Sequence, residues 1–235
     1  MNLILLFPED FIAADTVRLT GRRQQHIRDV HRAGEGDTLC VGLEGGGIGA
    51  GLIRRWNEQG IEMQVSFETQ PPPKLPLILV LALPRPKVLK RILIAATSLG
   101  VEQIHLIHSW RVEKSFWHSD LLKPDALREP LVLGLEQAKD TIIPSIELHR
   151  FFKPFVQDVL PLLSADSRRL VAHPTAASPC PRNLGERTTL AIGPEGGFIP
   201  FEVELLASEG FTPIHCGPRI LRVETAVPAL ISRLF

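Results

Sequence analysis

Apolar and polar positions follow two different rhythms along the chain, and the change falls at Pro71-Pro72-Pro73-Lys74. Three consecutive prolines favour an extended segment and fit neither a helix interior nor a central strand. Before them, short apolar runs separated by glycine turns are typical of strands. After them, apolar runs alternate with stretches of helical periodicity. The pattern therefore predicts two domains, at residues 1–70 and 75–235.

The first domain is predicted to be a small β-barrel-like module. Asp37–Leu43 and Ile48–Arg54 flank the turn Glu44-Gly45-Gly46-Gly47, which indicates a hairpin, and Ile61–Phe67 supplies a further strand. Gly21–Arg32 is the exception, because its pattern favours a short helix ahead of the hairpin.

The second domain is predicted to be α/β, with a mainly parallel sheet covered by helices. Leu77–Leu83 is a continuous apolar run, as expected of a strand buried on both faces. Leu127, Leu131 and Leu135 recur at i, i+4 spacing, the apolar stripe of a packed helix. Further strands are predicted at Val101–Ile107, Ser145–His149, Arg169–Ala172, Leu190–Ile192 and Thr212–Cys216. Helices are predicted at Lys87–Leu99, Pro124–Lys139, Pro154–Leu163, Pro200–Glu209 and Leu221–Phe235, where Pro228 is expected to kink the last helix or end its first turns.

Composition and charge set limits on the function. The chain has 235 residues, of which 44% are hydrophobic and 22% charged, an ordinary globular balance. Lys and Arg together number 26, as do Asp and Glu. With no net field to attract a polyanion, any nucleic-acid binding must come from a local basic patch.

Cysteine usage and apolar run lengths bear on the compartment. Cys40, Cys180 and Cys216 are scattered and lack C-x-x-C spacing, so neither a disulfide framework nor a structural zinc site is indicated. The longest apolar run, Leu75–Leu83, is far below the roughly 20 residues of a membrane helix. Leu3–Phe7 is too short for a signal peptide. We therefore expect a cytoplasmic protein that does not contact a membrane.

Two Gly-Pro turns in the last fifth of the chain are its most informative motifs. The first is Ile192-Gly193-Pro194-Glu195-Gly196-Gly197-Phe198, and the second is Cys216-Gly217-Pro218-Arg219-Ile220-Leu221-Arg222-Val223-Glu224-Thr225-Ala226. Each follows a predicted strand and precedes a predicted helix, where ligands of α/β sheets bind. Glycine lets the backbone approach a ligand closely. A single turn of this kind is often only a connection, but two of them favour a small-molecule pocket built from main-chain groups.

These two motifs together resemble the bacterial 16S ribosomal-RNA uridine-N3 methyltransferases of the SPOUT superfamily. The resemblance extends over nearly the whole chain: His26–Arg32 with Gly36-Asp37 is similar to the family's PUA-like N-terminal barrel. It implies a C-terminal trefoil knot, a rare exception to unthreaded topology. It also implies S-adenosylmethionine as cofactor, 16S ribosomal RNA in the small ribosomal subunit as partner, and a homodimer packed through the knotted region. Four residues depart from the family pattern: Ser98, Asp140, Ile199 and Val223.

The resemblance and the chemistry of the turns assign the cofactor site. Main-chain groups at the glycines would read the adenine edge, apolar side chains would form walls around adenine and ribose, and Ala172-His173-Pro174 would form a third wall by resemblance. The expected cofactor-binding residues are His173, Ile192, Gly193, Pro194, Gly196, Gly197, Cys216, Gly217, Ile220 and Leu221.

Two residues after the second turn are the catalytic candidates. Uridine N3 must lose a proton before it attacks a methyl group, and the negative charge spreads onto the carbonyl oxygens. Arg222 is expected to stabilise that charge, because a guanidinium stays protonated and offers a planar fork of donors; the alternative is a solvated or phosphate-pairing arginine. Glu224 would position Arg222 or accept the proton, or it would only stabilise the helix dipole. Glu195 is expected to hold a partner loop across the dimer.

RNA binding is expected at a basic cluster in the first domain and at Arg219. Phosphate neutralisation by such a cluster would make RNA affinity salt-dependent; the alternative is a solvated helical face. The cluster contains Arg18, Arg22, Arg23, Arg28, Arg32, His26 and His31, of which Arg22, Arg23, His26 and Arg32 are the chosen RNA-binding residues.

No metal is expected, because the reaction needs none and no ligand set is evident. His105 and His108 lie near one strand end but lack a third ligand, so they are interpreted as ordinary polar groups. Two other functions stay open: a SPOUT methyltransferase with a different nucleotide target, and an RNA-binding ribosome-assembly factor that has lost catalysis.

Overall fold

The structure is a computed structural model and describes residues 2–235. The chain divides into two compact units, residues 1–72 with 132–143, and residues 73–131 with 144–235. The segment 132–143 lies within the range predicted for the second domain, yet it packs with the first unit. The reason is the burial of apolar side chains, because Val132 and Leu135 form one buried cluster with Leu3 and Leu5.

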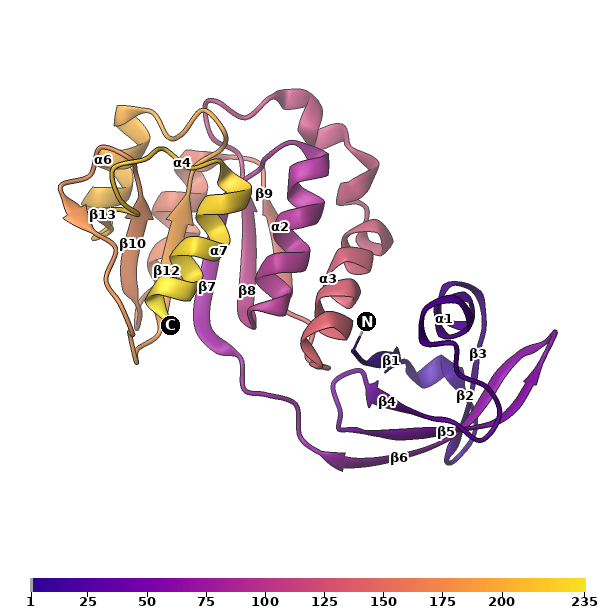
Figure 1. The fold of residues 1–235 in the computed structure, drawn as a ribbon. Helices are drawn as coiled ribbons and strands as arrows, with labels where there is room; N and C mark the ends of the chain where they lie inside the picture. Colours follow the sequence, from indigo (N-terminus) through magenta and orange to yellow (C-terminus); the bar gives the residue numbers. More distant parts are fainter. Residues whose placement is uncertain (1) are drawn as a thin grey trace. The chain divides into compact units, whose positions relative to one another are not determined.

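The first unit is built on a curled sheet that forms half a barrel (Figure 1). Its strand order is β1-β4-β5-β6-β3-β2, and β1 pairs with β4 in parallel while the other pairs are antiparallel. The predicted hairpin is β4–β5, and the predicted helix is an α-helical turn that continues into a π-helix. The elements are β1 (Ile4–Leu6), η1 (Pro8–Asp10), β2 (Phe11–Ala13), β3 (Thr16–Leu19), α1 (Gly21–His26), η2 (Ile27–His31), β4 (Thr38–Leu43), β5 (Ile48–Asn57) and β6 (Gly60–Thr69).

The second unit confirms the prediction of an α/β fold with a parallel sheet. Every strand pair in this sheet is parallel among the residues described, and the order is β11-β13-β10-β12-β7-β8-β9. Its elements are β7 (Leu75–Ala82), α2 (Pro86–Ser98), β8 (Val101–Ile107), η3 (Lys114–His118), η4 (Asp120–Leu122), α3 (Pro124–Ala138), β9 (Ser145–His149), α4 (Phe152–Pro154), η5 (Phe155–Val159), α5 (Leu160–Leu163), β10 (Arg168–Ala172), β11 (Ser178–Pro179), β12 (Thr188–Ile192), α6 (Pro200–Ser208), β13 (Thr212–His215) and α7 (Val223–Leu234).

The core of the second unit lies around its central strands. Leu77–Ala82 in β7 is buried throughout, as expected of a strand with helices on both faces. The C-terminal helix α7 packs beside α2 (Figure 1) and buries Val227, Leu230 and Leu234. Pro228 lies inside α7, which runs unbroken from Val223 to Leu234. The expectation that this proline would end the first turns of the helix is therefore wrong.

The predictions made from the length of the apolar runs and from the cysteine spacing can be compared with this fold. No helix within residues 2–235 combines the length and the apolar character needed to span a membrane. Cys40, Cys180 and Cys216 are all free thiols. Burial raises the pKa of the Cys180 thiol to about 11, so this side chain is an unreactive part of the core.

Candidate active site

A cavity of about 340 Å³ opens at the carboxyl ends of three adjacent parallel strands, β13, β10 and β12. The chain leaves each of these strands through a segment that lines the cavity: residues 172–174 after β10, 192–197 after β12, and 214–217 after β13. The first residues of α7 and the segment before it close the remaining side. This is the edge at which open α/β sheets bind ligands.

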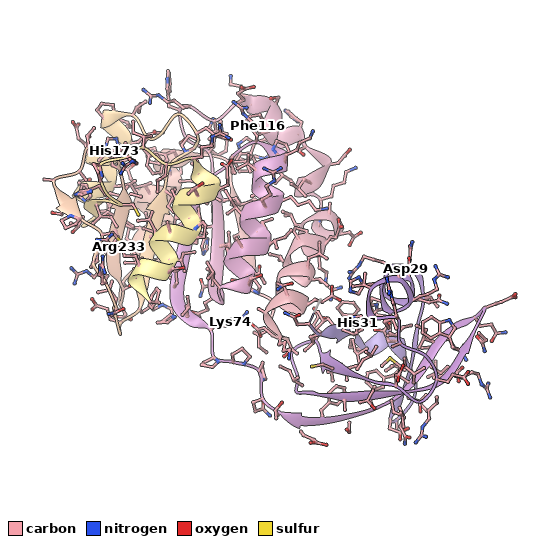
Figure 2. The ribbon with its side chains drawn as sticks, in the orientation of Figure 1. Asp29, His31, Lys74, Phe116, His173 and Arg233 are labelled. Atoms are coloured by element: carbon pink, nitrogen blue, oxygen red, sulfur yellow. The ribbon has the colours of Figure 1, made fainter. Side chains whose placement is uncertain are left out.

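All ten residues expected to bind the cofactor line this one cavity. His173, which Figure 2 labels, lies just beyond the end of β10, and its Nδ1 is 2.9 Å from the hydroxyl of Thr175. Ile192 is buried at the end of β12, while Ile220 is 83% exposed. The cavity thus has a buried apolar floor and an apolar rim that faces solvent.

The cavity is also bordered by Ala172 and Pro174, which were expected to form a third wall, and by four further residues of the two motifs, Glu195, Arg219, Val223 and Ala226. The sequence analysis missed three lining residues: Ile214, His215 and Leu230. Of the side chains around the second turn, His215 has a defined polar role, because its Nδ1 accepts the backbone N–H of Gly217 at 3.0 Å. Its position at the end of β13 was the available signal.

Steric contact explains why glycine is needed at Gly193. A Cβ at this position would lie 2.7 Å from the backbone nitrogen of Phe198 and 3.1 Å from the carbonyl carbon of Gly197. Those atoms belong to the backbone and cannot rotate away. The loop therefore folds back on itself only because residue 193 has no side chain.

Backbone conformation explains the glycines at two other positions. Gly197 has φ +71° and Gly217 has φ +125°, a region that L side chains rarely adopt. Gly196 differs, since an added Cβ would meet the flexible side chain of Arg111. The guanidinium of Arg111 donates to the carbonyl of Gly196, so the loop after β8 supports the first Gly-Pro turn.

A buried carboxylate supports the same turn from the other side. Glu202, in the first turn of α6, is 3% exposed, and its Oε2 accepts the backbone N–H of Ile199 at 3.0 Å. Its Oε1 accepts the backbone N–H of Trp110 at 2.7 Å. Ile199 has no capping hydroxyl, so Glu202 supplies the helix cap and ties it to the loop after β8.

We predict that Glu202→Ala lowers the free energy of unfolding by about 1–3 kcal/mol, because two backbone donors lose their acceptor. Chemical denaturation followed by fluorescence would measure this loss. Glu204→Ala is the matched control, since Glu204 lies on the exposed side of the same helix. Equal effects of the two substitutions would contradict the role of Glu202.

The two catalytic candidates do not line the cavity. Arg222 is the N-cap residue of α7 and is exposed, and its carbonyl accepts the N–H groups of Thr225 and Ala226. Glu224 lies in the first turn of the same helix and is half-buried. Their neighbours Leu221 and Val223 line the cavity, so Arg222 and Glu224 lie beside its rim and not within its lining.

The remaining motif residues have contacts within the chain. Glu195 accepts the backbone N–H of Arg85 at 3.1 Å, which gives it a partner in its own subunit. Val223 is buried and lines the cavity.

Asp140 lies outside the two motifs, just after α3. It is buried, and its Oδ1 accepts the N–H groups of Thr141 and Ile142 at 2.7 and 2.9 Å. This departure from the family pattern thus holds the turn after α3.

The basic cluster of the first unit is largely engaged in ion pairs. Arg18 pairs with Glu62 and Arg28 with Asp29. Arg23 makes a two-pronged pair with Asp10, with one contact of 2.6 Å, and also donates to the carbonyl of Leu5. The side chain of Arg23 is only 15% exposed, so little of it is open to a phosphate, and its role in RNA binding stays a prediction.

Arg22 and Arg32 are the exposed members of the chosen set. Arg22 lies 3.0 Å from the buried carboxylate of Glu136 and is 45% exposed. Burial raises the pKa of Glu136, and the charge of Arg22 opposes that rise. Arg32 ends the π-helix with a left-handed backbone, at φ +52°.

The imidazoles of His26, at the end of α1, and His31, at the end of η2, meet edge to face with their ring centroids 5.1 Å apart. Burial lowers the pKa values of both. Figure 2 labels His31, together with Asp29. A lowered pKa reduces the positive charge that either imidazole offers to a phosphate.

Comparison with known proteins decides the family. Residues 71–235 match the family model described as an RNA methyltransferase domain. This chain belongs to the RNA methyltransferase domain family. The membership indicated by the two glycine-proline motifs is thereby confirmed.

Within this family, the chain is similar to proteins named ribosomal RNA small subunit methyltransferase E. The protein of that name from Treponema pallidum is 29% identical over 235 residues, which cover 97% of this chain and 88% of the relative. The one from Mesomycoplasma hyopneumoniae is 30% identical over 164 residues, or 68% of this chain and 70% of the relative.

Solved structures of RNA methyltransferase relatives have the same fold. Ribosomal RNA small subunit methyltransferase E from Neisseria gonorrhoeae, bound to S-adenosyl methionine, superposes with a TM-score of 0.76 at 19% identity, over 99% of this chain and 95% of that one. A protein from Legionella pneumophila, in complex with the same cofactor, superposes with a TM-score of 0.75 at 22% identity, over 99% of this chain and 96% of that one. Both the half-barrel and the parallel sheet are thus features of the fold.

Proposed function

We propose that this protein transfers a methyl group from S-adenosylmethionine to N3 of a uridine in 16S ribosomal RNA of the small ribosomal subunit. One observation carries the proposal: the ten residues that the two Gly-Pro motifs and residue 173 assign to the cofactor meet at one cavity. Its similarity to methyltransferases E over 97% of the chain supports the same substrate. A ribosomal RNA substrate would place the enzyme in the cytoplasm.

The cavity suits an adenosine-containing ligand. Its volume is at the lower end of the range for small-molecule sites, and its lining combines apolar side chains with main-chain groups. Gly193, Gly196 and Gly217 would present backbone N–H and C=O groups to the adenine edge. Ile192, on the buried floor, would pack against the adenosine. When bound, the sulfonium cofactor supplies an activated methyl group.

The catalytic part falls to side chains at the rim. Arg222 would hold the negative charge that develops on the uracil carbonyl oxygens once N3 has lost its proton. Glu224, in the first turn of α7, would orient Arg222 or take up that proton. Arg219 lines the cavity and would meet the RNA backbone, because it is exposed and carries a permanent charge.

RNA would also be held by the first unit, which we propose to be a PUA-like module. Arg22 and Arg32 would neutralise phosphates, with His26 beside them, and affinity would fall as salt rises. Because N3 lies inside a base pair, the target uridine must be unpaired or flipped out.

A trefoil knot and a homodimer complete the proposal. Three hydrogen bonds join the segment Cys180–Leu184 to the end of α7: the N–H groups of Asn183 and Leu184 donate to the carbonyls of Arg233 and Leu234, and the Arg233 side chain donates to the carbonyl of Cys180. This close association of the C-terminal helix with an earlier loop supports threading. The exposed side chains of Ile220 and Phe201 near the site would be covered by the second subunit.

Methylation of unmodified small ribosomal subunits tests the function. We expect the purified protein and labelled S-adenosylmethionine to yield 3-methyluridine in 16S ribosomal RNA, identified by nucleoside mass spectrometry. A different methylated nucleotide would favour a SPOUT enzyme with another target. Absence of cofactor binding in calorimetry at millimolar ligand would favour the inactive assembly factor.

A further inference from the structure

Three side chains with metal-binding atoms meet at the edge of the parallel sheet, on strands β8 and β9. His105 lies directly opposite Glu147 in the β8–β9 register, and His149 follows two residues later on the edge strand. Residues two apart on a strand face the same side of the sheet. Pairing of the two strands therefore gathers two imidazoles and a carboxylate on one face.

The distances between their ligand atoms suit a single ion. Nδ1 of His105 lies 3.0 Å from Nε2 of His149, and Oε2 of Glu147 lies 3.8 Å from the first atom and 3.7 Å from the second. The point in the plane of these three atoms that is equidistant from them lies about 2.0 Å from each, and an ion displaced by about 0.5 Å from that plane, toward a fourth ligand, lies about 2.1 Å from each. Zinc binds histidine nitrogen at about 2.0–2.1 Å and carboxylate oxygen at about 2.0–2.2 Å.

Packing holds the two imidazoles in place. His105 is only 2% exposed, and its ring lies nearly parallel to that of His149, whose centroid is 4.4 Å from the ring centroid of Phe155. The two ring nitrogens that face each other are therefore fixed before any ion binds.

Glu147 is the solvent-facing member of the group. Its side chain is 60% exposed, whereas that of His149 is 16% exposed. An ion could therefore enter from the Glu147 side and keep one coordination position open to water.

No spacing along the chain indicates this arrangement, because the ligands lie on two different strands. His108, the nearer histidine in sequence, accepts a hydrogen bond from Trp117 Nε1 at 2.8 Å instead. Its interpretation as an ordinary polar group agrees with this contact. The partners of His105 are brought to it only by the sheet.

We propose that His105, Glu147 and His149 form a binding site for one zinc ion or a chemically similar divalent transition metal. Nδ1 of His105, Nε2 of His149 and a carboxylate oxygen of Glu147 are its ligands, and a water molecule completes a tetrahedron. The ion fastens the edge strand β9 to β8, whose C-terminal loop carries Trp110 and Arg111 to the glycine turn. Its role is structural and does not depend on the proposed methyl transfer.

Metal titration of the tag-free full-length protein, after removal of metals with a chelator, tests this site. We expect one equivalent of Zn²⁺ to bind in competition with a chromophoric chelator, and Co²⁺ to give the intense visible absorption of a tetrahedral site. Saturating Zn²⁺ should raise the melting temperature by mass action.

Substitutions identify the ligands. Glu147→Gln and His149→Asn should each weaken Zn²⁺ affinity by about a hundredfold. Losing a hydrogen bond that only orients a metal ligand already costs up to about that much, and these changes remove a ligand itself. The exposed position of Glu147 means that Glu147→Gln should fold normally. His118→Asn, at an exposed histidine outside the cluster, is the control and should leave affinity unchanged.

Two results would overturn the proposal. One is the absence of stoichiometric Zn²⁺ binding by the wild-type protein at micromolar metal. The other is binding that survives both Glu147→Gln and His149→Asn, which would place the ion elsewhere. In either case the two histidines form only a buried hydrogen-bonded pair.

Discussion

Arg222→Ala should reduce the rate of methyl transfer about 10²- to 10³-fold, the usual cost of removing one group that stabilises a developing oxyanion. The side chain of Arg222 is exposed at the N-terminus of α7 and does not line the cavity. Removing it should therefore leave affinity for S-adenosylmethionine nearly unchanged. Single-turnover methylation of small ribosomal subunits and calorimetry with the cofactor measure the two quantities separately.

Two variants sharpen this test. Arg222→Lys keeps the charge but loses the planar fork of donors, so it should recover only part of the rate. Arg182→Ala removes an exposed arginine from outside the cavity lining and should have little effect. If Arg222→Ala lowers cofactor affinity as much as it lowers the rate, Arg222 supports the fold of the turn and does not act on the uracil.

Gly193→Ala should weaken binding of S-adenosylmethionine by about tenfold or more, the equivalent of the roughly 1–3 kcal/mol that overpacking costs. The added methyl group would lie 2.7 Å from the backbone nitrogen of Phe198, so the loop must move. That loop forms one wall of the cavity. Calorimetry with the cofactor, and with S-adenosylhomocysteine, measures the loss.

A graded series controls for the effect of the methyl group itself. Gly196→Ala should cost less, because its Cβ would meet a flexible arginine side chain. Gly185→Ala should be neutral, since that position has open space around it and an ordinary φ. A loss of affinity in Gly185→Ala as large as in Gly193→Ala would mean that steric contact in the loop is not the cause.

Local sequence signals predicted most of the second unit. The boundaries of Val101–Ile107 and Ser145–His149 agree with β8 and β9. For β8 the signal was a largely buried run, whereas β9 is an exposed edge strand. Strand β11, of two residues, was missed, since its pairing with β13 depends on the sheet and not on its own residues. Most of the cavity lining followed from the two motifs, because two glycine-rich turns that each follow a strand favour one pocket.

Contacts between distant residues limited the prediction elsewhere. Nothing near Arg23 in the sequence shows that it pairs with Asp10, a contact that leaves little of its side chain exposed. The packing of 132–143 with the first unit has the same origin, because Val132 and Leu135, which pack with Leu3 and Leu5, belong to a helix whose apolar pattern is continuous. The glutamate that caps α6 was also hidden, although Glu202 stands at the third helical position, where capping glutamates are common.

The strand order of the parallel sheet limits how far the protein can fold while the ribosome is still synthesising it. Strand β12 is inserted between β7 and β10, and β10 in turn lies beside β13. A nascent chain that has emerged only as far as β10 would carry the apolar flank of β7 without its neighbour, and such exposed edges invite aggregation or chaperone capture. Pairings across so many residues also form slowly. Because residues of α7 also line the cavity, synthesis must run through the last helix before the enzyme can acquire its methyl donor.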